Sequence, residues 1–171
     1  MPSEKQKIKP FDSIIGIVIY SVILMIPVFS KEYFGVWLFD EDKFVGIVPF
    51  LTGNMDQLTY VLLLFILGLW ILKDGIKLFY ERMTNFLASS ITVMNSFSLV
   101  IILYLFLKGK IWNENLMKDA VNSGTVTIGS DAYTVLQKAW EQSTFWFPIL
   151  LVIGLVAEIL WSFWKANKTE E

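Results

Sequence analysis

Charged side chains inside long apolar segments are the residues of this sequence most able to carry chemistry. Lys73, Asp74 and Lys77 lie near the end of one such segment, and Glu158 lies about two turns before the end of another. A charge at the centre of a bilayer costs at least about 2.5–3.5 kcal/mol, so such groups usually pair or serve a function. One hypothesis is an intramembrane ion-pair cluster in which Glu158 faces Lys73 or Lys77. We favour the other interpretation, in which each long side chain reaches the headgroup region unaided.

A run of polar residues within the segment 86–107 is a second candidate. Ser89, Thr92 and Ser96 recur at three- and four-residue spacing and are expected to share one face of a helix. Asn95 lies near the middle of the segment and needs a partner there. A polar pathway for a solute would usually add a charge in mid-span. We therefore favour a helix-packing face, because small and hydroxylated residues let helices approach closely.

The groups that most catalytic and metal sites need are missing. The sequence contains no histidine and no cysteine, which removes the usual general base, the commonest metal ligand and any thiolate. The acidic run Asp40-Glu41-Asp42 lacks the spacing of a calcium loop, and we interpret it as a solvated turn. No basic patch indicates a nucleic-acid partner. We expect no enzymatic activity, no cofactor and no metal.

Four apolar segments must position these residues. Hydrophobic residues make up 55% of the 171 residues and charged residues 18%, whereas soluble domains are about 25% charged. A transmembrane helix needs about 20 mostly apolar residues, and residues 11–30, 58–78, 86–107 and 145–164 meet this requirement. Residues 1–171 are therefore predicted to form a single membrane domain. Its expected fold is an all-α integral membrane protein, a bundle of four transmembrane helices with the lipid bilayer as its partner.

The distribution of cations predicts the orientation. Eight cations lie on three short segments: Lys5, Lys7, Lys9, Lys73, Lys77, Arg82, Lys165 and Lys168. The two longer loops, residues 31–57 and 108–144, carry six lysines and nine acidic residues. The side denser in cations is expected to be cytoplasmic, so both chain ends are predicted to be inside. A signal peptide would also begin with lysines, but the first apolar stretch is longer than a typical one and we interpret it as a span.

The two outer loops have patterns of their own. Residues 33–39 and 44–50 are aromatic and β-branched stretches on either side of a polar turn, which predicts a small extracytoplasmic β-hairpin. Its aromatic residues are expected to form an outer surface resting on the lipid headgroups: Trp37, Phe39, Phe44 and Phe50. In the second loop we expect two short helices, over about 113–121 and 131–142, with a short strand at 125–128 between them.

Four stretches resemble the membrane portion of the bacterial HAAS signalling-domain proteins, which are often encoded beside PadR-type transcriptional regulators. The stretches are PFDSIIGIVIYSVILMIPVF, FGVWLFDEDKFVGIVPFL, ILKDGIKLFYERMTNFLAS and VIGLVAEILWSFWKANK. In order, they are similar to the family's first span, its outer hairpin, the basic turn between its second and third spans, and its closing span. Family members usually carry a helical cytoplasmic domain before the first span, whereas only Met1 to Pro10 precede it here.

The resemblance implies a multi-pass protein of the bacterial cytoplasmic membrane. It further implies a small regulatory or accessory role, in which the protein senses the envelope and signals to a cytoplasmic or membrane protein partner. The alternatives are a subunit of a transporter or channel, and an immunity-type protein that protects its host from membrane-active peptides. The sequence does not predict the signal, the partner or the oligomeric state.

Overall fold

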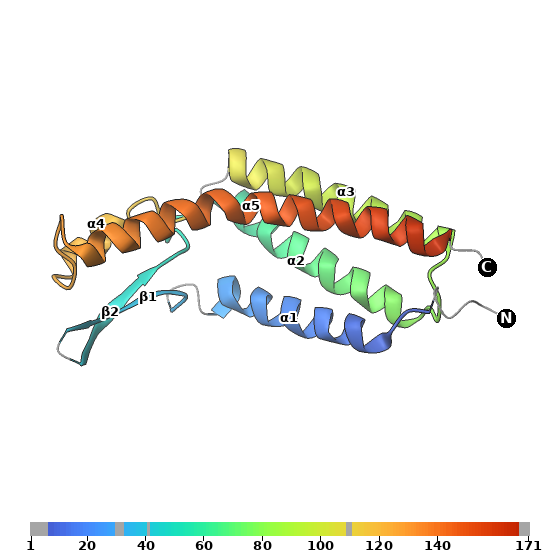
Figure 1. The fold of residues 1–171 in the computed structure, drawn as a ribbon, viewed down its shortest axis with the longest axis horizontal. Helices are drawn as coiled ribbons and strands as arrows, with labels where there is room; N and C mark the ends of the chain where they lie inside the picture. Colours follow the sequence, from blue (N-terminus) through green and yellow to red (C-terminus); the bar gives the residue numbers. More distant parts are fainter. Residues whose placement is uncertain (1–6, 30–32, 41, 109–110, 168–171) are drawn as a thin grey trace.

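The computed structural model describes residues 7–29, 33–40, 42–108 and 111–167, in which five helices and two strands form. They are α1 (Pro10–Phe29), β1 (Gly35–Asp40), β2 (Lys43–Pro49), α2 (Gln57–Leu78), α3 (Asn85–Leu107), α4 (Leu116–Asn122) and α5 (Asp131–Ala166) (Figure 1). Among the described residues, α1, α3 and α5 are long and apolar enough to cross a membrane. The span expected at residues 58–78 corresponds to α2, a helix of 22 residues, which is not one of these three.

The long helices lie side by side and alternate in direction (Figure 1). α1 packs against α2, α2 against α3, and α3 against α5. α1 begins and α5 ends at one end of the molecule, and the hairpin and α4 gather at the other end. We call this other end the head, which consists of β1, β2, α4 and the first third of α5.

Three of the long helices begin at a residue that caps them. Asp56, Thr84 and Ser130 have extended backbones, and each side chain accepts a hydrogen bond from the backbone N–H three residues later. Such caps satisfy one of the free N–H groups at a helix start. They place the starts of α2 and α3 close to those of the predicted spans, and the start of α5 at that of the helix expected at 131–142.

α5 differs from the expectation of a loop helix followed by a separate span. It is continuous over 36 residues, or about 54 Å at 1.5 Å per residue, which exceeds a hydrocarbon core of about 30 Å. Residues 142–145 contain neither glycine nor proline, and Thr144 donates its hydroxyl hydrogen bond to the carbonyl of Trp140 at 2.9 Å. Nothing in the local sequence therefore ends the helix between its head portion and its apolar portion.

The head has a core of its own, built from both predicted loops. β1 and β2 form the predicted hairpin, an antiparallel pair with an irregularity between Leu38 and Phe39. Leu38 and Val48, on its inner face, are buried together with three residues from α4 and the segment after it: Leu116, Ala120 and Val126. Tyr133, Leu136 and Trp140 of α5 pack against this cluster. A hairpin alone is marginally stable in water, and here α4 and α5 cover one of its faces.

Backbone hydrogen bonds join the two loops where the head meets the long helices. Thr52 N donates to Ile111 O, and Asn113 N donates to Phe50 O, both at 2.9 Å. Asn113, at the start of the helix expected at 113–121, donates from Nδ2 to the carbonyl of Pro49 at 3.1 Å, and α4 begins after Asn115. The strand expected at 125–128 is wrong, since these residues form turns and bends.

Candidate functional site

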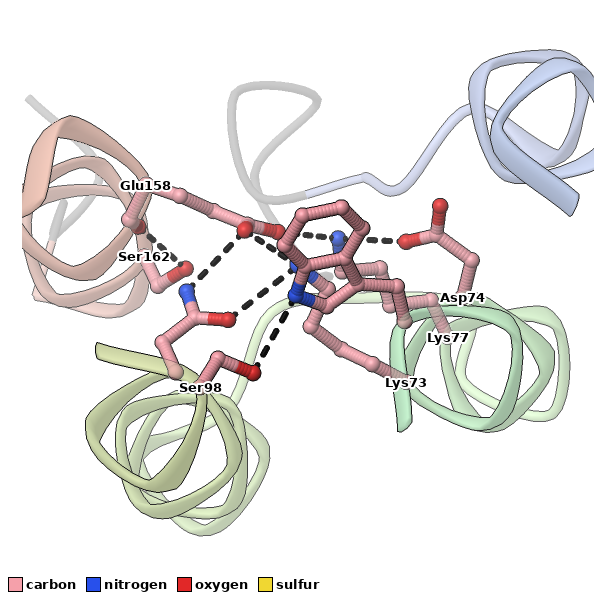
Figure 2. Close-up of polar contacts among 8 residues, drawn as sticks. Lys73, Asp74, Lys77, Ser98, Glu158 and Ser162 are labelled. Atoms are coloured by element: carbon pink, nitrogen blue, oxygen red, sulfur yellow. Dashed lines mark hydrogen bonds and ion pairs between the residues drawn. The ribbon is translucent and has the colours of Figure 1, made fainter. Parts of the chain in front are cut away.

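A cluster of charged and polar side chains joins α2, α3 and α5. α2 contributes Lys73, Asp74 and Lys77, with the two lysines one turn apart on the same face. α3 contributes Asn95 and α5 contributes Glu158. Figure 2 shows Lys73 and Lys77 of α2 and Glu158 of α5 pointing toward one another between the helices. We call these five residues the polar cluster.

The carboxylate of Glu158 is the centre of the polar cluster. Its Oε2 accepts hydrogen bonds from Lys73 Nζ and from Asn95 Nδ2, the latter at 3.0 Å. Its Oε1 accepts from Lys77 Nζ at 2.6 Å. Lys77 Nζ also donates to Asp74 Oδ1 at 2.8 Å, and Lys73 Nζ donates to Asn95 Oδ1 at 3.2 Å. Every charged group in the cluster therefore has an oppositely charged partner.

Burial makes this pairing necessary. The side chain of Lys73 is 2% exposed, that of Asp74 8% and that of Lys77 16%, whereas Glu158 is 26% exposed. Removing one member of a buried ion pair costs about 3–5 kcal/mol, because the remaining charge has no partner. Two cations and two carboxylates balance each other, so the cluster can hold three helices together without a net charge.

The neighbouring polar contacts extend this connection. Trp70 Nε1 donates to Ser98 Oγ at 3.1 Å, which links α2 to α3. Ser162 Oγ donates to the carbonyl of Glu158 at 2.8 Å, one turn away in α5. Both serines are buried, so these hydrogen bonds satisfy polar groups that have no access to solvent.

α1 reaches the cluster through Gly16. A Cβ atom at Gly16 would lie 2.0 Å from Asp74 Oδ2 and 3.1 Å from its carboxyl carbon. The missing side chain therefore lets α1 approach the carboxylate of Asp74 closely. Ser13, one turn earlier in α1, is 3% exposed.

The predicted polar face of α3 is wrong in part. Asn95 is buried, and Thr92 is half-buried with its hydroxyl donating to the carbonyl of Ala88 at 2.9 Å. Ser89 and Ser96 are exposed. Consecutive residues are rotated by about 100° around the axis of a helix. Ser96 therefore points away from the buried face on which Asn95 lies. The buried face instead contains Leu87, Ala88, Ile91, Asn95, Ser98, Ile102 and Leu105.

The predicted aromatic surface also needs one correction. Trp37, Phe39 and Phe44 are more than half exposed, and the ring centroids of Trp37 and Phe44 lie 5.6 Å apart. Phe50 does not belong to this surface, because it stacks on Trp140 at 5.4 Å and packs against the head core. The irregularity between Leu38 and Phe39 shifts the register, so Phe44 faces outward while Val48, and Phe50 two residues later, face the head core. Glu41 of the predicted turn lies outside the described residues.

Two members of the site are difficult to identify from sequence. Asn95 was expected to need a partner, but helical spacing alone does not show that it lies at the same depth as Lys73. The approach of Gly16 to Asp74 has no signal in the sequence, because three other glycines also lie within helices.

Within the described residues, no group of three or more carboxylates could hold a metal ion. The cluster is suited to fastening helices together, since its hydrogen bonds and ion pairs join α2, α3 and α5.

No protein family, curated protein or solved structure matches this chain.

Proposed function

We propose that this chain is a small regulatory or accessory protein of the bacterial plasma membrane, which senses a signal through its head. In this proposal α1, α2, α3 and α5 all cross the membrane, both chain ends are cytoplasmic and the head faces outside. α2 lies between α1 and α3, two of the three helices suited to crossing. Its charged residues are paired within the polar cluster, which lowers the cost of placing them in a membrane.

The observation that carries this proposal is the continuity of α5. Tyr133, Leu136 and Trp140 pack against the head core, and Glu158 of the same helix holds the polar cluster. α5 remains helical through Pro148, which removes one backbone hydrogen bond between Trp140 and Glu158, so we expect its two portions to move together. A change in the packing of the head would therefore shift Glu158 relative to Lys73 and Lys77, and thereby the cytoplasmic ends of the helices. Such a rigid element with two arrangements is what coupling between distant sites requires.

Distances between spin labels in lipid nanodiscs test this coupling. The sequence has no cysteine, so Glu81→Cys and Asn167→Cys place two unique labels at the proposed cytoplasmic end. We expect Trp140→Ala, which removes the stack on Phe50, to shift or broaden this distance by about 2 Å. Val135→Ala is the control, since Val135 is 68% exposed. An unchanged distance, with near-ultraviolet circular dichroism showing a rearranged head, would contradict the proposal.

A flux assay separates this role from transport. We expect no ion flux through the purified protein in liposomes, because the charged groups of the polar cluster are paired with each other. A flux that Glu158→Gln changes would instead favour the transporter or channel alternative.

A further inference from the structure

We propose that a cavity in the head binds a lysine or arginine side chain of an amphipathic cationic peptide. The cavity has a volume of about 350 Å³ and lies between the inner face of the hairpin and the end of α4. This inference rests on the proposed function, in which the head faces outside and receives the signal. It adds the chemical class of that signal.

Gly46 creates the space. It pairs with Leu38 in the hairpin, so both residues lie on the face that packs into the head. A Cβ atom at Gly46 would meet nothing within 4 Å, and its backbone does not have the positive φ that would require glycine. A larger residue would therefore fit at this position and fill the cavity. The glycine leaves open a site that Leu38, Val48 and Pro49 line with apolar surface.

The other side of the cavity is suited to a cation. It is lined by Asp119, Asn122 and Ser123. Asp119 Oδ2 accepts one hydrogen bond, from Asn113 Nδ2 at 3.2 Å. None of the ion pairs in the described part of the chain includes Asp119. The carboxylate therefore carries a negative charge at the cavity wall that an arriving cation could neutralise.

The shape and charge of the head favour a peptide side chain over a small amine. Lysine and arginine combine an apolar stem with a charged end, which matches an apolar wall followed by a carboxylate. Residues 31–57 and 108–144, the two loops from which the head is built, hold nine acidic residues and six lysines, and this excess of negative charge attracts a polycation. A free polyamine would share the charge but would leave the wall of Leu38, Val48 and Pro49 uncovered.

Calorimetric titration in nanodiscs of zwitterionic phosphatidylcholine tests this inference. The probe is a short peptide of alternating leucine and lysine, with its lysine-acetylated form and spermidine as comparisons. We expect Asp119→Asn and Gly46→Leu each to weaken binding of the peptide by about tenfold or more. The matched controls are Asp131→Asn, which removes the same charge elsewhere in the head, and Gly53→Leu, at another glycine whose Cβ would meet nothing within 4 Å.

Several outcomes would overturn the inference. Equal losses in Asp119→Asn and Asp131→Asn would mean that diffuse charge binds the peptide. Equal binding of the acetylated peptide would remove the role of the cation, and equally tight binding of spermidine would make the cavity an amine site. Thermal unfolding shows whether Asp119→Asn disturbs Asn113, and Gly46→Leu does not depend on that contact. Because the spin-label experiment uses no peptide, failure of the cavity and failure of the coupling are distinguishable.

Discussion

At the scale of single residues, Glu158 is the group on which the most contacts depend. It accepts hydrogen bonds from Lys73, Lys77 and Asn95, which come from two other helices. Its removal would leave the almost fully buried Lys73 with only the amide oxygen of Asn95. The stability of the long helices should therefore respond more to this carboxylate than to any exposed one.

We expect Glu158→Gln to lower the free energy of unfolding in detergent by about 3 kcal/mol, the low end of the range for a buried pair because Glu158 is partly exposed. Thermal unfolding of the purified protein measures the effect. Glu141→Gln is the control, since Glu141 is exposed and its side chain accepts a hydrogen bond from Gln137 of the same helix. The double variant Lys73→Met with Glu158→Met should regain part of the loss, because no unpaired charge stays buried. Equal melting temperatures for Glu158→Gln and Glu141→Gln would contradict the role of the cluster.

Asp56, at the start of α2, makes a pH-dependent contribution to the stability of the protein. Thr59 donates its hydroxyl to Oδ2 at 2.6 Å and its backbone N–H to Oδ1 at 2.9 Å. These hydrogen bonds hold the pKa of Asp56 below its ordinary value of 3.8. A group whose pKa is lower in the folded state contributes its full stabilisation at pH values above its pKa in the unfolded state. This stabilisation is lost as the pH falls through the pKa of the folded state.

The measurement is the difference in free energy of unfolding between the native protein and Asp56→Asn, which can still cap the helix. We expect a constant difference from neutral pH down to about pH 4, followed by a decrease in the native protein's advantage at lower pH. A difference that stays constant into strong acid would show that the ionised carboxylate contributes nothing.

At the scale of elements, the approach of α1 to α2 depends on Gly16. We expect Gly16→Ala to destabilise the protein by about 1–3 kcal/mol, because its Cβ would overlap the carboxylate of Asp74 and displace it from Lys77. Gly68→Ala is the matched control within α2, since a Cβ there would meet nothing within 4 Å. It should be neutral or slightly stabilising, as alanine is the better helix former. Thermal unfolding of both variants measures these effects. Equal effects would mean that α1 does not contact Asp74 closely.

Elements of this protein differ in how well the sequence predicts them. The starts of α2 and α3 follow from apolar length, and the hairpin follows from two aromatic and β-branched stretches around a polar turn. The continuity of α5 does not follow, because Trp140 and Trp146 also suit a boundary between water and membrane. The packing of α4 on the hairpin depends on residues far apart in the sequence, such as Val48 and Leu116.

The sequence likewise predicts only some residues of the candidate site. Lys73, Lys77 and Glu158 are identifiable because charges are rare in apolar segments, and the structure brings them together. The exposure of Ser89 and Ser96 was missed, because periodicity gives the relative angle of two residues but not which face meets a neighbouring helix. The packing of α3 against α2 and α5 decides that face, and it buries Asn95 and Ser98 instead.

At the scale of the whole molecule, the proposed coupling between the head and the cytoplasmic ends depends on α2 crossing the membrane. If α2 crosses, the polar cluster lies within the bilayer near the cytoplasmic side, and the head and the chain ends lie on opposite sides. α5 then carries a change in the head across the membrane. If α2 does not cross but α1, α3 and α5 do, the hairpin and the turn between α2 and α3 share one side and α4 lies on the other, so the head could not form.

Cysteine labelling in intact cells tests this claim most directly. Single cysteines at Asn54, Glu114, Glu81 and Asn167 occupy exposed positions at the two ends of the long helices, in a chain with no cysteine of its own. We predict that a membrane-impermeant maleimide labels Asn54→Cys and Glu114→Cys in intact cells, and Glu81→Cys and Asn167→Cys only after permeabilisation. Labelling of Asn54→Cys and Glu81→Cys from the same side would contradict a four-helix crossing.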